Sequence, residues 1–275
     1  MEVTWPMPRN VERLGTAAFR IGYIAIFVVM LLPLGIVVAT SFSASGNLQF
    51  PPQALSVQWY SAFFADVVWL RAFDNSLVAG IGTTVVATFM GITAAFGLEA
   101  HRGRFGSILT PIVILPLLIP PVILGVTLLV YFSRLGLRSS YLSIILAHSL
   151  WATPLVFFVM QSVFQRFDWQ LRDAGMDLGA NPIRVFVHVI LPNVKSGILV
   201  SALLAFIISL QEFVMALFLS NYQTQTIPVL AWNSLRQSLT PIVSVVSTFL
   251  ILVSVVGLLV AALATNIEFV AKRLS

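Results

Sequence analysis

The chain has 275 residues, of which 59% are hydrophobic and only 9% are charged, and it contains no cysteine. A soluble domain carries roughly 25% charged residues, so this chain cannot cover itself with polar surface and most of it must be solvated by lipid. The lack of cysteine excludes disulfides, thiolate metal sites and cysteine nucleophiles. The net charge of +5 comes from sparse basic residues between apolar spans, which does not fit the basic stripe of a nucleic-acid-binding protein.

Six apolar stretches are long enough to cross a bilayer, which takes about 20 mainly apolar residues in a helix. They cover residues 21–41, 75–98, 107–132, 142–164, 197–220 and 242–265. The first run, Ile21 to Thr40, exceeds the roughly 7–15 apolar residues of a signal peptide, so we interpret it as an uncleaved helix. The sequence therefore predicts an all-α integral membrane protein of about six transmembrane helices.

The basic residues predict the orientation, because Lys and Arg are enriched in cytoplasmic flanks. With the N-terminus inside, 11 of the 15 basic residues are cytoplasmic, and the outside segments hold only Arg71, Arg134, Arg138 and Arg236. Both termini are therefore predicted to be cytoplasmic, in an N-terminal segment 1–20 and a C-terminal tail 266–275.

The predicted periplasmic segment, residues 42–74, is the longest on its side. It carries Phe50-Pro51-Pro52 and the aromatic residues Trp59, Tyr60, Phe63 and Phe64. Aromatic residues gather at the membrane–water interface. Two interpretations stay open, an interfacial helix on the outer leaflet and a docking surface for an external partner.

The third span contains four prolines, Pro111, Pro116, Pro120 and Pro121. Proline in a membrane helix frees a backbone carbonyl that neighbouring helices or a water-filled cavity must satisfy. We expect a bent helix, and both kinked packing and contact with a ligand remain open for it.

The cytoplasmic loop between the fourth and fifth spans covers residues 165–196, and its first half predicts a short helix. Asp168 can cap that helix, and Leu171, Ala174 and Leu178 share one face at helical spacing. Gly179 stands where a left-handed C-terminal cap is needed.

A second short helix is predicted in the other half of the loop. Asn181 can cap it, with Pro182 in its first position. Leu191-Pro192 is expected to end it. The loop would thus present two short helices, joined by a tight turn, to the cytoplasm.

The loop resembles the EAA loop of type I ABC importer permeases, whose pattern is Glu-Ala-Ala, three residues, Gly, nine residues, Ile, one residue, Leu-Pro. The matching run is Leu171-Arg172-Asp173-Ala174-Gly175-Met176-Asp177-Leu178-Gly179-Ala180, followed by Val189-Ile190-Leu191-Pro192. Asp173 stands for the glutamate and keeps its carboxylate. Gly175 replaces the second alanine, which weakens that helical turn by roughly 1 kcal/mol.

This resemblance implies a type I permease core over residues 75–265, in which the coupling loop 165–196 docks on a cytoplasmic ATPase. The implied docking residues are Leu171, Asp173, Ala174, Gly175, Leu178, Gly179, Ala180, Leu191 and Pro192. The implied partners are a second related permease subunit, two ABC ATPase subunits and a periplasmic solute-binding protein, assembled in the bacterial inner membrane. ATP and Mg are expected in the ATPases, because this chain has no Gly-x-x-x-x-Gly-Lys-Ser/Thr phosphate loop. No cofactor, metal site or catalytic residue is expected on it.

Shorter patches across about residues 57–265 resemble the polyamine and opine branch of the family. They are Ser56-Val57-Gln58-Trp59-Tyr60, Asn75-Ser76-Leu77, Pro120-Pro121-Val122-Ile123-Leu124-Gly125, Ser209-Leu210-Gln211-Glu212-Phe213 and Ile227-Pro228-Val229 to Thr240-Pro241. The resemblance implies that the solute is a polyamine, an opine or a related amino compound.

Glu212 is placed near the centre of the fifth predicted span, where a charge costs several kcal/mol unless it is paired, neutralised or hydrated. It either contacts a cationic substrate, together with Gln211 and Ser209, or lies hydrogen-bonded between two permease subunits. Both roles stay open.

Two other residues are pathway candidates, Trp151 and Tyr131. Trp151 lies in the fourth span beside His148, and we interpret this lone histidine first as a hydrogen-bonded packing residue. Tyr131, beside Phe132 at the outer end of the third span, either lines an entrance or anchors the interface.

An intramembrane protease and an ion-coupled secondary transporter are the other classes of membrane protein to consider. An intramembrane protease would need a His-Glu-x-x-His pattern or two carboxylates within the spans, and neither occurs. An ion-coupled secondary transporter commonly shows repeats and intramembrane charges, whereas this sequence predicts neither a repeat nor a charge network. The ion-coupled transporter is kept as the alternative to the permease.

Overall fold

A computed structural model describes residues 9–100, 104–237 and 239–274. The first eight residues of the predicted N-terminal segment, Arg102 of the first predicted cytoplasmic loop and Ser275 of the predicted tail lie outside these ranges. Across the described ranges the chain is almost entirely helical, and its one β-feature is an isolated antiparallel bridge between Ser43 and Leu55.

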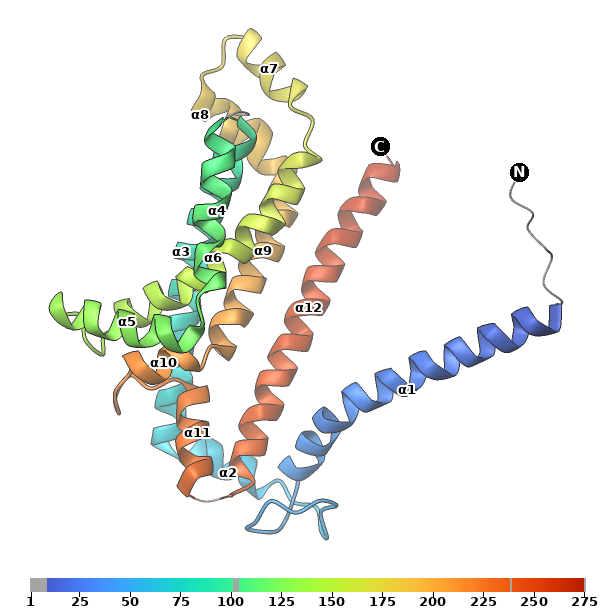
Figure 1. The fold of residues 1–275 in the computed structure, drawn as a ribbon, viewed down its shortest axis with the longest axis vertical. Coiled ribbons are helices and arrows are strands. Elements are labelled where there is room, and N and C mark those ends of the chain that lie inside the picture. The colour runs from blue at the N-terminus through green and yellow to red at the C-terminus, as the bar shows by residue number, and fades with distance from the viewer. Residues whose placement is uncertain (1–8, 101–103, 238, 275) are drawn as a thin grey trace. The chain divides into compact units, whose positions relative to one another are not determined.

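The helices follow one another as shown in Figure 1. Their bounds are α1 Arg9–Ser41, α2 Gln58–Ala65, α3 Val67–Ala100, α4 Arg104–Leu118, α5 Pro121–Arg134, α6 Tyr141–Gln165, α7 Gln170–Asp177, α8 Pro182–Val185, the π-helix η1 Phe186–Ile190, α9 Leu191–Gln211, α10 Val214–Leu219, α11 Ile227–Gln237 and α12 Ile242–Leu274. Within the described ranges, five helices can cross a membrane, or six when the bent pair α4–α5 counts as one span. The prediction of an all-α chain with about six spans is confirmed.

Some predicted bounds were wrong. The second span begins at Val67, well before the predicted residue 75, so α3 takes up the end of the predicted periplasmic segment. The fifth span ends at Gln211 and not at residue 220. Helix α11 was not predicted at all.

The chain divides into two compact units, one of residues 1–63 with 239–248 and the other of residues 64–238 with 249–275. In the first unit, polar contacts join α1 to later segments. The hydroxyl of Thr40 donates to Ser244 Oγ at 3.0 Å, and Ser41 Oγ lies 2.8 Å from Tyr60 Oη.

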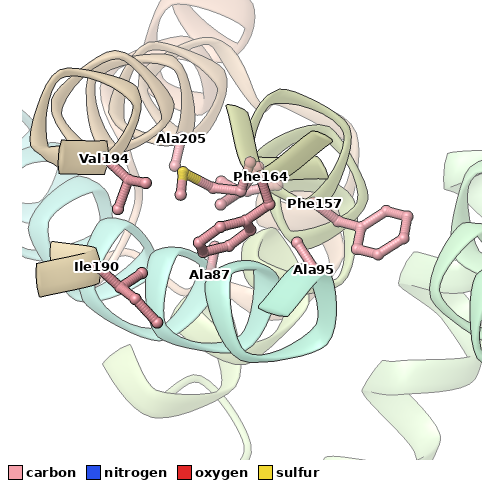
Figure 2. Close-up of a cluster of buried hydrophobic side chains, with 10 residues drawn as sticks. Ala87, Ala95, Phe157, Phe164, Ile190, Val194 and Ala205 are labelled. Carbon is pink, nitrogen blue, oxygen red and sulfur yellow. The ribbon is translucent and has the colours of Figure 1, made fainter. Parts of the chain in front are cut away.

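The core of the second unit lies between α3, α6 and α9 (Figure 2). Helix α3 places Ala79, Ala87 and Ala95 at intervals of eight residues, and all three are fully buried. A Cβ added at Gly91 of the same helix would lie 2.5 Å from Val156 Cγ1 on α6. Small residues let membrane helices approach closely, so α3 and α6 pack almost backbone to backbone.

The predicted bend in the third span is confirmed. The axes of the two halves meet at 98°, and Pro120, with φ −55° and ψ 133°, lies at the break. The residue before a proline is disfavoured in the helical conformation, so the Pro120-Pro121 pair interrupts the helix. Helix α5 then packs against α10, where a Cβ at Gly125 would lie 2.6 Å from the ring of Phe218.

Candidate functional site

The predicted coupling loop is a protruding segment of the second unit, and α7 forms its outermost part (Figure 1). No residue of α7 is buried. The side chains of Leu171 and Leu178 are 45% and 89% exposed. A short helix and the residue that follows it thus expose two apolar side chains to solvent.

The predicted cap at Asn181 is confirmed, whereas α7 has Trp169 at its N-cap and Asp168 binds one residue earlier than a cap would. Asp168 Oδ1 accepts from the backbone N–H of Gln170 at 3.0 Å, and Asn181 Oδ1 accepts from that of Arg184 at 2.8 Å. Gly179 has φ +84°, the left-handed conformation that suits glycine after a helix. The turn that contains Leu178, Gly179 and Ala180 is therefore built as predicted.

The predicted stop at Leu191-Pro192 is wrong. The apolar span runs without interruption from Pro182 to Gln211, because the backbone widens into the π-helix η1 just before Pro192. Proline cannot donate the usual backbone hydrogen bond and crowds the preceding turn, and a π-turn is a common way to relieve this inside a helix. The side-chain amide of Asn193 donates to the carbonyl oxygen of Val189 at 2.7 Å.

Gly175 has a packing role that sequence analysis missed. A Cβ at this position would lie 3.2 Å from Cγ2 of Val185, tighter than an ordinary contact. The glycine thus lets α7 lie close to α8. Its neighbour Ala174 is exposed, as is Asp173, whose nearest charged partner is Arg172 at 4.0 Å.

Four aromatic residues form the base of the loop, which we call the aromatic base: Phe96 of α3, Phe164 of α6, Trp169 before α7 and Phe186 of η1. The ring centroid of Phe96 lies 5.8 Å from Phe164, 6.0 Å from Trp169 and 5.3 Å from Phe186. Sequence analysis missed this cluster, although aromatic residues flank the loop on both sides.

The second candidate region lies at the far end of α9, where the helix stops. Glu212 is extended, with ψ 120°, so it does not lie inside a continuous span as predicted. Its Oε1 accepts from the backbone N–H of Met215 at 2.9 Å and its Oε2 from that of Ala216 at 3.0 Å. The carboxylate therefore caps α10 and favours the break in the helix.

His148 of α6 is fully buried beside this carboxylate. Its Nε2 lies 3.2 Å from Glu212 Oε2, an ion-pair distance that lacks the alignment of a hydrogen bond. Its Nδ1 lies 2.8 Å from Ser209 Oγ, which donates to Thr83 Oγ1 at 3.2 Å. The expected hydrogen bond of His148 is confirmed, and its contact with Glu212 was not predicted.

The other pathway candidates lie elsewhere. Gln211 donates to Ser254 Oγ of α12 at 2.8 Å. Trp151 is half-buried, and its Nε1 has no hydrogen-bond partner among the described residues. Tyr131 lies with Phe132 in the wall of an apolar cavity of about 410 Å³ between α3, α4, α5 and α6. The structure therefore joins Ser209 and Glu212 through His148 and leaves the other three candidates apart from them.

Comparison with known proteins gives a matching family, several related permeases and solved structures of similar fold. Residues 87–270 match the family described as binding-protein-dependent transport system inner membrane component. The putrescine transport system permease protein PotI of Escherichia coli is 30% identical, covering 88% of this chain and 89% of its own. The spermidine/putrescine transport system permease protein PotC of E. coli is 24% identical, with coverage of 87% and 90%.

A third relative, a probable molybdenum ABC transporter permease protein of Haloferax volcanii, is 33% identical over 72% of this chain and 77% of its own. Among solved structures, a bacterial ABC transporter that imports alginate matches with a TM-score of 0.70 at 16% identity, covering 97% of this chain and all of that one. A bacterial alginate ABC transporter in complex with a pentasaccharide-bound periplasmic protein matches with a TM-score of 0.71 at 18% identity, with coverage of 94% and 96%. At these identities the solved structures establish the fold.

Proposed function

The chain belongs to the family of binding-protein-dependent transport system inner membrane components, and from this premise we propose how it couples to its partners and what it carries. It is a multi-pass inner-membrane permease subunit of an ABC importer. We propose that its loop 165–196 docks on a cytoplasmic ATPase subunit, with both chain termini on the same side of the membrane.

One observation carries this proposal: α7 presents Leu171 and Leu178 to solvent at the end of a well-capped loop. Exposed apolar side chains on a rigid short helix suit a groove in a partner protein. Asp173, 64% exposed, would pair with a basic or donor group in that groove. When two ATPases close on ATP, the helix would move as a unit, and the adjoining spans would follow.

Three further partners complete the proposed importer. A second, related permease subunit would form the other half of the pathway, and a periplasmic solute-binding protein would deliver the solute. ATP and Mg would bind the ATPase subunits, and this chain would make and break no bonds. No observation favours the alternative of an ion-coupled secondary transporter, since the relatives are ABC permeases.

We propose a polyamine, an opine or a related amino compound as the solute. Two relatives whose names specify putrescine or spermidine cover 87–88% of this chain, whereas the relative named for molybdenum covers 72%. Uptake of labelled putrescine and spermidine by cells with and without the gene tests this class. Uptake that is unchanged by the deletion, with a change in molybdate uptake, would contradict it.

Co-purification tests the docking proposal. The tagged chain would be extracted from its native membrane, and the bound proteins would be identified by mass spectrometry. We expect an ABC ATPase subunit with the wild type, and its loss from Gly179→Val and from Asp173→Lys. Gly136→Val is the matched control, because Gly136 also has a positive φ, +71°, but lies between α5 and α6. Retention of the ATPase by the Gly179 variant would contradict docking at this loop.

A further inference from the structure

The carboxylate of Glu212 is fully engaged within its own chain. Each oxygen accepts a backbone N–H at the start of α10, and Oε2 also faces His148 Nε2. The side chain of Glu212 is 9% exposed and that of His148 is 0% exposed. These contacts of the carboxylate all lie within its own chain, so a role in holding α10 follows from the contacts that it makes.

Hydrogen bonds also connect His148 to two other helices. Its Nδ1 lies 2.8 Å from Ser209 Oγ on α9. Ser209 in turn donates to Thr83 Oγ1 of α3, and Thr83 donates to the carbonyl oxygen of Ile145 at 3.5 Å. The imidazole ring thus lies between Ser209 and the Glu212 carboxylate, 3.2 Å from Oε2.

These contacts form a closed circuit through three helices. It leaves α6 at His148, passes through Ser209 of α9 and Thr83 of α3, and returns to α6 at Ile145. Glu212 adds the first turn of α10 to the circuit. The same α6 and α9 flank the coupling loop at their other ends, and α10 packs against α5 at Gly125.

We propose that His148 is a positioning residue that holds Glu212 against α6, so that α10 follows the α6–α9 pair when the coupling loop moves. The drive for that movement rests on the proposed docking of an ATPase. The connection itself is a property of this chain, and it adds a polar contact to the apolar packing of Met215 and Leu219 of α10 with Ile144 and Ala147 of α6.

Spin labels on the purified full-length protein, with whatever subunits co-purify, test the proposal. The chain has no cysteine, so two introduced cysteines are the only sites on it that a thiol-reactive spin label can modify. Phe158→Cys on α6 and Tyr222→Cys after α10 report the position of α10, and both side chains are exposed. Phe158→Cys with Leu199→Cys on α9 is the control pair, because the apolar core holds α6 against α9 independently of His148.

We expect one narrow Phe158–Tyr222 distance in the otherwise unchanged protein, both without nucleotide and after trapping with ATP and vanadate. His148→Leu should broaden the distribution of Phe158–Tyr222 distances. His148→Gln, which keeps a polar group near the position of Nε2, should restore the narrow distribution. The Phe158–Leu199 distance should stay narrow in every variant. If His148→Leu does not fold, Ser209→Ala removes the partner of Nδ1 and should broaden the Phe158–Tyr222 distance in the same way.

Three results would overturn the proposal: a narrow Phe158–Tyr222 distance in His148→Leu, failure of His148→Gln to restore it, or broadening of the control distance as well. The test does not depend on the docking proposal, because the distances are measurable without nucleotide. Absence of an ATPase from the preparation would refute docking and leave the role of His148 to be judged by the label distances alone.

Discussion

The indole Nε1 of Trp169 donates a hydrogen bond to the carbonyl oxygen of Phe164, 3.1 Å away. That carbonyl belongs to the last turn of α6, and it also accepts from the backbone N–H of Phe167 at 3.2 Å. A side chain of the predicted coupling loop thus binds the end of a membrane helix. The orientation of α7 is therefore tied to α6 through Trp169 as well as through the chain itself.

Replacing Trp169 with alanine should loosen α7. The change removes rings from contact with Phe96 and Phe164, which we expect to cost about 2 kcal/mol for this half-buried side chain. Hydrogen exchange of residues 168–180 should quicken, and less ATPase should co-purify. Trp169→Phe keeps a ring and loses only the hydrogen bond, at a cost of about 1 kcal/mol. Equal exchange rates in the wild type and the alanine variant would contradict this role of Trp169.

Gly175 should tolerate alanine but not leucine. Alanine gains about 1 kcal/mol of helix propensity, which offsets the tight 3.2 Å contact of its Cβ with Val185. Leucine would push α7 away from α8 and displace the exposed face that we propose to dock on the ATPase. Titration of the purified permease with its ATPase should show near wild-type affinity for Gly175→Ala and several-fold weaker binding for Gly175→Leu. Wild-type affinity of the leucine variant would argue against close packing of α7.

Two glycines on α3 should respond to alanine in opposite directions. A Cβ at Gly91 would lie 2.5 Å from Val156 Cγ1 and 3.0 Å from the backbone nitrogen of Phe157, whereas a Cβ at Gly97 meets nothing within 4 Å. Gly91→Ala should lower the free energy of unfolding by about 1–3 kcal/mol through overpacking. Gly97→Ala should raise it by up to about 1 kcal/mol through helix propensity. Unfolding of the purified chain by sodium dodecyl sulfate measures both, and equal shifts would refute the close α3–α6 contact.

His148 and Glu212 should show energetic coupling in a double-mutant cycle. His148→Leu and Glu212→Leu should each cost about 3 kcal/mol, because each leaves the other partner buried without its counterpart. The double variant should cost less than the sum by more than about 1 kcal/mol. The same detergent titration supplies the four free energies. Additive losses would show that the two side chains act independently.

A matched control for this cycle is available on the same helix. Thr153 is buried on α6, and its hydroxyl has no hydrogen-bond partner among the described residues. Thr153→Val, combined with Glu212→Leu, should give additive changes in the free energy of unfolding.

The lengths of the apolar spans and the turn in the loop 165–196 were predictable, because they depend on local composition and on the conformations of single residues. The backbone hydrogen bonds of Asp168 and Asn181 and the left-handed Gly179 follow from side chains that act on their own backbone. The bend at Pro120-Pro121 has the same local origin. For that reason the sequence sufficed for the number of spans, the bent third span and the left-handed turn at Gly179.

The predictions were wrong where a side chain distant in sequence or an irregular turn determines where a helix ends or how it packs. Glu212 ends a span because it can cap α10 while His148, 64 positions earlier in the chain, lies beside it. No periodicity in the sequence pairs these two residues. Pro192 was expected to stop a helix, yet the backbone absorbs it in η1. The close packing at Gly175 likewise depends on Val185, which lies near Gly175 only in the folded loop.

The π-turn at residues 186–190 has a mechanical consequence. Because it replaces a break, the helical rod from Pro182 to Gln211 contains 30 residues and is about 45 Å long at 1.5 Å per residue. Such a rod would act as a lever arm with one end in the proposed coupling loop. A rotation of only about 5° about that end would carry Gln211 through about 4 Å, so a small rearrangement at the loop is amplified across the membrane.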